Sequence, residues 1–115
     1  MTVLQQLVEL WEGPEQDDYG RLRPTRKVFK EVMCLLIEVH LVPIPTGCVS
    51  ADAEGGVRIE WVRPRMNVHL VIPSNRNYWC NGAYIFHKFD DDYTTEDATP
   101  GRLAHRLRQL KCSQT

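Results

Sequence analysis

The chain has 115 residues, of which 43% are hydrophobic and 25% charged, and this length suits one globular domain rather than two. Fourteen Lys and Arg residues against fifteen Asp and Glu residues give a net charge of −1, which argues against a general polyanion binder. No apolar run reaches the roughly 20 residues of a membrane span and no secretion signal opens the chain, so we expect a soluble cytoplasmic protein without a membrane partner.

The first half of the chain predicts two helices. Apolar residues recur at helical spacing over residues 2–11, behind Thr2 as N-cap, and Gly13-Pro14 ends this segment. Residues 12–23 combine Gly, Pro and acidic residues and are typical of a loop. The strongest helical pattern follows over residues 25–40, which should form the main core helix.

The second half changes to a period of two, which is typical of strands. Residues 57–62 and 67–72 alternate apolar and polar side chains, and the short segment 63–66 between them predicts a hairpin. Matching the apolar faces predicts three cross-strand pairs: Trp61 with Val68, Ile59 with Leu70 and Glu60 with His69.

The remaining segments complete an α+β fold. We expect extended chain over 47–52, a third strand over 78–88, a short edge strand at Tyr93-Thr94 and a helix that begins at Thr99-Pro100. The order predicts a single domain over 1–115, a two-layer sandwich. Its antiparallel meander of three to four strands would be covered on one face by two N-terminal helices and one C-terminal helix.

The four cysteines are widely spaced, at positions 34, 48, 80 and 112, without the short Cys or His spacings of a zinc site. We therefore expect reduced thiols, no metal and no cofactor. Cys34 stands in an apolar stretch and is predicted to be buried.

Charge is segregated along the chain although its sum is near zero. Residues 1–20 carry −5, residues 21–30 carry +5, residues 88–97 carry −4 and the last segment carries +4. Opposite blocks can neutralise one another within the chain, or a block can steer a partner protein. The predicted partner-binding residues are the basic cluster, the hairpin tip and one aromatic anchor: Arg21, Arg23, Arg26, Lys27, Lys30, Arg63, Arg65 and Trp79.

Glu60 and His69 form the nearest approach to a catalytic pair. A carboxylate beside an imidazole can act in general base chemistry, and Arg58 nearby can hold an anion. The alternative is a cross-strand ion pair on a solvated sheet, which we favour because no nucleophile lies close in sequence. The contiguous acids Asp90, Asp91 and Asp92 lack the spacing of a calcium loop and predict a solvated turn.

Aromatic residues near the third strand permit two readings. Tyr78, Trp79, Tyr84 and Phe86 can form a stacking surface for single-stranded nucleic acid or contribute to the core, and we expect at least half in the core. Trp11 and Trp61 lie on apolar faces and are predicted core residues.

The element Gly55-Gly56-x-x-x-Glu60-Trp61, with Trp11, an Asp-x-Gly loop and a Pro-x-Pro stretch, resembles a loose group of short bacterial proteins of unknown activity. The resemblance implies stand-alone accessory proteins, among them suspected toxin–antitoxin or mobile-element components, and transfers no catalytic residue.

The combined expectation is a non-enzymatic protein-interaction module, antitoxin-like or regulatory, that binds another protein. A free edge strand is compatible with a homodimer. The alternatives are a small hydrolase or nuclease using Glu60 and His69, and nucleic-acid binding through the basic segment 21–30.

Overall fold

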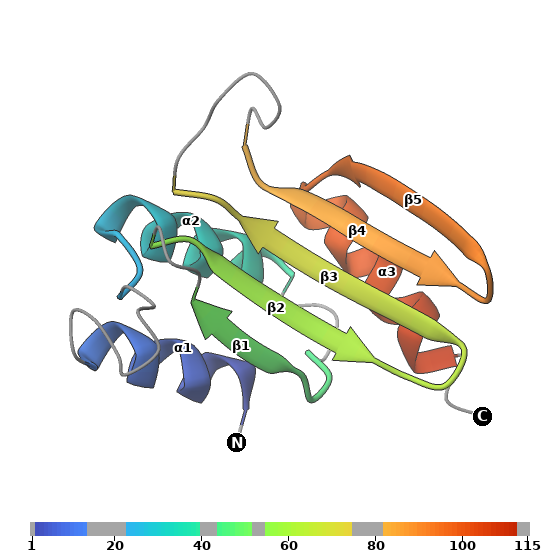
Figure 1. Ribbon diagram of the computed structural model, residues 1–115, viewed down its shortest axis with the longest axis horizontal. Helices are drawn as coiled ribbons and strands as arrows, with labels where there is room; N and C mark the ends of the chain where they lie inside the picture. The colour runs from blue at the N-terminus through green and yellow to red at the C-terminus, as the bar shows by residue number, and fades with distance from the viewer. Residues whose placement is uncertain (1, 14–22, 40–43, 52–54, 75–81, 113–115) are drawn as a thin grey trace.

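The computed structural model describes residues 2–13, 23–39, 44–51, 55–74 and 82–112. These residues form eight elements (Figure 1), in the order α1 (Val3–Glu12), α2 (Arg26–Glu38), β1 (Cys48–Ala51), β2 (Val57–Val62), β3 (Met66–Ile72), β4 (Tyr84–Phe89), β5 (Asp92–Asp97) and α3 (Pro100–Cys112).

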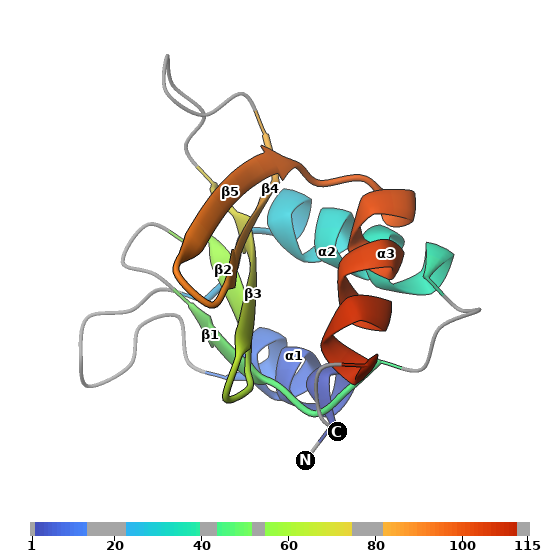
Figure 2. The same ribbon diagram turned by 90° about the vertical axis from the view of Figure 1, so that its right-hand side faces the viewer.

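The five strands form one antiparallel sheet in the order β1-β2-β3-β4-β5, so each strand pairs with its neighbour in the chain. All three helices lie against the same face of this sheet and leave the other face uncovered (Figure 2). The predicted α+β fold with one covered face is confirmed. Among the described residues, no helix has the length and apolar character needed to cross a bilayer.

The sheet has more strands than the three to four predicted. The extended segment near residue 48 pairs with β2, and the expected short edge strand is a full six-residue strand. The sequence predicted only Tyr93-Thr94 of β5, because five of its six residues are exposed and the sixth, Glu96, is an acid that faces the helices. A strand of this kind has no apolar alternation to detect.

The hairpin register is as predicted. Trp61 pairs with Val68, and the two neighbouring predicted pairs are present as well. The inward residues of β2 and β3 are all buried. This burial fixes the register, because a shift by one residue would turn both apolar faces toward solvent.

Threonines begin all three helices. The Thr2 hydroxyl accepts a hydrogen bond from the Gln5 amide (3.1 Å), and Thr25 and Thr99 do the same for amides three residues later. The two N-caps predicted, at Thr2 and Thr99, are thus confirmed. Gly55 adopts a positive φ of 87°, as expected for the turn before β2, and its carbonyl accepts from the Thr25 amide (3.1 Å).

The core lies between the sheet and the helices, and Trp61 is its largest fully buried side chain. The indole nitrogen of Trp61 donates to the Pro45 carbonyl (2.9 Å). A Cβ at Gly47 would lie 2.8 Å from this indole, so only glycine fits there. Trp11 is half-buried rather than fully buried, and it stacks on Phe29 with ring centroids 4.7 Å apart.

Two local predictions need correction. Cys34 is exposed, not buried, because it stands on the outer side of α2, where it lines a shallow pocket with Leu35 and Ala98. Of the strand predicted over 78–88, the described part shows β4 over Tyr84–Phe89 with Gly82 and Ala83 outside the strand, and residues 78–81 lie outside the described part of the chain.

Candidate functional site

Three cross-strand rows of side chains make up the open face of the sheet. Their members follow from the strand register, since residues directly opposite one another share a face. The first row is Ser50, Arg58, Val71, Tyr84 and Asp97; the second is Cys48, Glu60, His69, Phe86 and Thr95; the third is Val62, Asn67, Lys88 and Tyr93.

An aromatic strip crosses the middle of this face. The His69 ring meets Phe86 edge-on at 5.6 Å between centroids, and Phe86 lies 5.8 Å from Tyr93. The ammonium of Lys88 stands 5.1 Å from the centre of the Tyr93 ring, a cation–π contact. Tyr93 is 64% exposed, so the strip ends in an aromatic side chain presented to solvent.

Tyr84 and Phe86 lie outside the core. Both belong to the open face, because the inward positions of β4 are Ile85 and His87. Tyr78 and Trp79, the other two aromatic residues of that group, lie outside the described residues.

Glu60 and His69 are direct cross-strand neighbours, but each has another partner. The Glu60 carboxylate pairs with Arg58 of its own strand (3.6 Å), and His69 packs against Phe86. Partial burial lowers the pKa of His69 and Arg58 lowers it further, against the opposing effect of Glu60. Because this pKa lies below 6.5, the neutral imidazole, which can act as a base, predominates at pH 7.

The structure adds a thiol that sequence proximity could not reveal, because Cys48 lies opposite Glu60 in the same row. Cys48 and His69 are two strands apart, a separation of about 10 Å between backbones. A nucleophile and its base must be within hydrogen-bond reach, and here the carboxylate lies between them. The row is not arranged as a nucleophilic triad.

The two arginines of the β2–β3 turn serve the fold. Arg63 donates to the carbonyls of Val62 (2.9 Å) and Thr46 (3.0 Å). Arg65 pairs with the Asp90 carboxylate (3.4 Å), so that it joins the β2–β3 turn to the β4–β5 turn. Neither guanidinium points to the pair formed by Glu60 and His69.

The basic segment stands at the opposite end of β2 from this turn, next to the start of the strand (Figure 1). Six strand residues separate the two, which is about 20 Å. Arg26, Lys27 and Lys30 are exposed and make no ion pair within the described residues, while Arg23 lies over the Trp11 ring at 5.6 Å. Arg21 and Trp79 lie outside the described residues. The predicted contact residues that the structure describes therefore fall into two separate groups.

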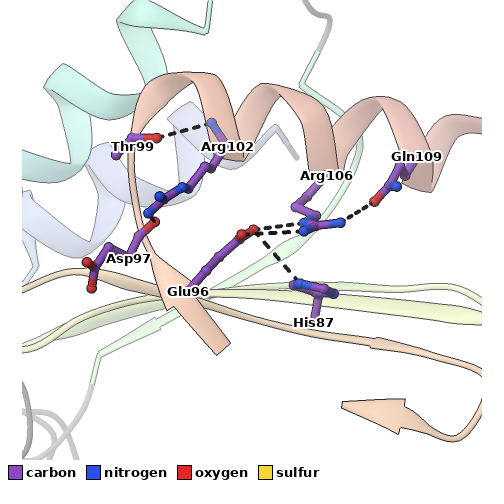
Figure 3. A network of polar contacts seen from close by, with 7 residues as sticks. All are labelled: His87, Glu96, Asp97, Thr99, Arg102, Arg106 and Gln109. Carbon is purple, nitrogen blue, oxygen red and sulfur yellow. Dashed lines mark hydrogen bonds and ion pairs between the residues drawn. The ribbon is translucent and has the colours of Figure 1, made fainter. Parts of the chain in front are cut away.

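The acidic segment 88–97 and the basic last segment meet between the sheet and α3 (Figure 3). Glu96 of β5 faces the helices and receives two hydrogen bonds from the Arg106 guanidinium, at 2.8 and 3.4 Å. These hydrogen bonds hold the pKa of Glu96 below its ordinary value. Arg102 also donates to the Asp97 carbonyl (3.2 Å). Glu96 and Arg106 therefore connect these two blocks by an ion pair within the chain.

His87 lies beside this pair, with Nε2 3.8 Å from a Glu96 oxygen, and its Nε2 is buried without a hydrogen-bond partner. Burial lowers the pKa of His87, as does Arg106, and these effects outweigh the attraction of Glu96. The imidazole is neutral at pH 7.

Among the described residues, no group of three or more His, Cys, Asp or Glu side chains is placed to hold a metal ion. Comparison with protein families, curated proteins and solved structures gives no match. The aromatic strip on the open face follows from the alternation of residues in β4 once the strand register is known.

Proposed function

We propose that this protein is a small protein-binding module and that the open face of its sheet contacts the partner. The observation that supports this most directly is the aromatic strip from His69 through Phe86 to the exposed Tyr93. Aromatic side chains at a solvent-facing position supply large contact area at low entropic cost, and they are enriched at the centre of protein interfaces.

The charges on this face suit a protein better than a nucleic acid. Arg58 and Lys88 are accompanied by Glu60 and Asp97 on the same face, so both signs occur around the strip. A polyanion would be repelled by the two carboxylates, whereas a protein surface with an apolar centre and mixed charges can match all four. A regulatory or antitoxin-like role is the biological form of this proposal.

A tagged form of the protein should recover a stoichiometric partner from the source organism, and the purified complex then permits a matched comparison. Tyr93→Ala and Ile37→Ala each remove an exposed apolar side chain, 64% and 62% exposed, from the sheet face and from α2 respectively. Tyr93→Ala should weaken binding about tenfold or more, with Ile37→Ala near wild type. A protein that stays monomeric with no stoichiometric partner, or a loss confined to Ile37→Ala, would contradict the proposal.

A hydrolytic or nucleolytic role is the second candidate, because Glu60 and His69 are direct neighbours in the register. In that case Glu60→Gln and His69→Ala should each abolish turnover without loss of the fold, as checked by circular dichroism. Equal activity in both variants would remove this candidate.

A further inference from the structure

The two edges of the sheet differ in what covers them. At the β1 edge, the Gln6 side chain of α1 accepts from the Val49 amide (2.9 Å) and donates to the Gly47 carbonyl (2.8 Å). This single amide occupies two of the outward backbone groups to which an additional strand would bond. No described residue covers the centre of β5 in this way.

The direction of each backbone group in β5 follows from the ladder. The Ala98 amide donates to the Ala83 carbonyl (3.0 Å), which continues the pairing of β4 with β5. Bonded and non-bonded pairs alternate in an antiparallel ladder. The residues that bond to β4 are therefore Asp92, Thr94 and Glu96.

The alternate residues of β5 direct their backbone groups outward. Arg102 confirms this direction, because its guanidinium reaches the Asp97 carbonyl at that edge (3.2 Å). Tyr93 and Thr95 have no partner for their outward amides and carbonyls within the described residues. Four hydrogen-bonding groups in a row are thus available for a further strand.

Charge then indicates what kind of strand would fit. Acids stand at both ends of β5, and its centre is uncharged. Glu96 is neutralised by Arg106, but Asp91, Asp92 and Asp97 are exposed and form no ion pair with a described residue. A second copy of this chain would bring the same acids against them, which disfavours pairing of β5 with itself.

We propose that the β5 edge accepts an extended, basic segment of the partner protein as a sixth strand. This inference rests on the proposed function and specifies the partner's chemistry. Backbone hydrogen bonds to Tyr93 and Thr95 supply the register, and Lys or Arg side chains at both ends of the added strand pair with the free carboxylates. The neighbouring Tyr93 ring would pack on the added strand's open-face side chains.

A labelled peptide tests this with purified protein. The sequence Lys-Lys-Thr-Val-Thr-Val-Lys-Lys places cations at both ends and reads the same charge pattern in either direction. Fluorescence anisotropy should show saturable binding about tenfold tighter than for the peptide with Glu in place of Lys, and weaker binding at high salt. A third peptide, N-methylated at its four central residues, keeps the charge and should not bind.

A proline variant distinguishes binding at the β5 edge from binding on the open face. Thr95→Pro removes an outward amide without taking a bond from β4, so the fold should persist and peptide binding should be lost. Should Thr95→Pro not fold, the double variant Asp92→Lys/Asp97→Lys should reverse the preference toward the Glu peptide. Phe86→Ala reports on the open face, and Ile37→Ala, on α2 away from the β5 edge, is the control that should keep peptide binding.

The outcomes distinguish the two proposals. Loss of peptide binding in Phe86→Ala with retention in Thr95→Pro would overturn strand addition and support a binding site on the face. Failure of the Lys peptide to bind, or unchanged preference after charge reversal, would also overturn strand addition, whereas the proposed function is judged separately by the Tyr93→Ala and Ile37→Ala comparison with the partner.

Discussion

The two edge strands, β1 and β5, are anchored in different ways. β1 is held along its edge, where the Gln6 amide bonds to the backbone on either side of Cys48, and from within, where Gly47 fits against Trp61. β5 is anchored on the helix-covered face of the sheet, where Arg106 of α3 forms an ion pair with Glu96 (2.8 Å). The first arrangement occupies outward backbone groups of an edge strand, and the second leaves those of Tyr93 and Thr95 without a partner among the described residues.

This difference shows how one small domain can cover one edge of its sheet and leave the other edge accessible to a further strand. Unpaired strand edges promote unwanted association, and natural proteins blunt them with covering side chains or charge. β1 uses a covering side chain, and β5 uses exposed carboxylates. Carboxylates at a strand edge repel an acidic strand and attract a basic one, so they discriminate between partners. A neutral amide that covers an edge only prevents strand pairing.

Loss of the anchor under β5 should have the largest effect. Arg106→Leu leaves the Glu96 carboxylate without its partner, and both side chains are only about one fifth exposed. We expect a loss of about 2–3 kcal/mol in the free energy of unfolding, less than for a fully buried pair. Urea denaturation measures it, with Arg108→Leu on the exposed side of α3 as the control. Equal losses in both variants would show that the ion pair does not anchor β5.

The internal anchor of β1 comes next. In Gly47→Ala the new methyl group would lie 2.8 Å from the Trp61 indole and 2.9 Å from the Glu60 carbonyl, so the strand must shift. The expected loss is about 1–3 kcal/mol. Gly101→Ala is the matched control, because nothing lies within 4 Å of its added Cβ, and a helical alanine there should stabilise the protein slightly. A neutral Gly47→Ala would contradict this close fit.

Removal of the β1 cover should cost less. Gln6→Ala deletes two hydrogen bonds to β1, which we expect to lower stability by about 1–2 kcal/mol and to speed hydrogen exchange at the Val49 amide. Gln5→Ala, one residue earlier, touches only the cap of α1 through Thr2 and should leave that amide protected. Unchanged exchange in Gln6→Ala would mean that the β1 edge is closed by something else.

The smallest effect is a pH dependence on the β5 side. The folded-state pKa of His87 is below its ordinary 6.5, so the unfolded chain takes up more protons as the pH falls through this value and stability declines. Melting temperature should be lower near about pH 5.5 than near about pH 7.5. His69, whose pKa is also lowered, adds with the same sign. His87→Gln should reduce the slope, and an unchanged slope in a His69→Gln/His87→Gln double variant would contradict this assignment.

Sequence patterns predicted the parts of the fold that bury apolar surface in a regular period. Three helices, the β2–β3 register and the uncovered sheet face all follow from such periods, because a wrong phase would expose a whole apolar row. β5 was underestimated because its inward acid, Glu96, is tolerated only beside Arg106 of α3. The burial of Cys34 was predicted wrongly because its sequence neighbours are apolar. Consecutive residues of a helix point in different directions, and only the side that faces the core is buried.

The charge blocks were likewise visible in the sequence, whereas their contacts depend on the tertiary structure. The sequence alone showed a near-zero net charge and four segments of alternating sign, and it predicted a single domain. Only the tertiary structure decided that the last two blocks meet through Glu96 and Arg106, that the hairpin arginines are occupied, and that Tyr93 and Thr95 keep an open edge. Periodic burial is a local property of the chain, but the neighbour that satisfies a charge or a backbone amide is set by elements distant in sequence.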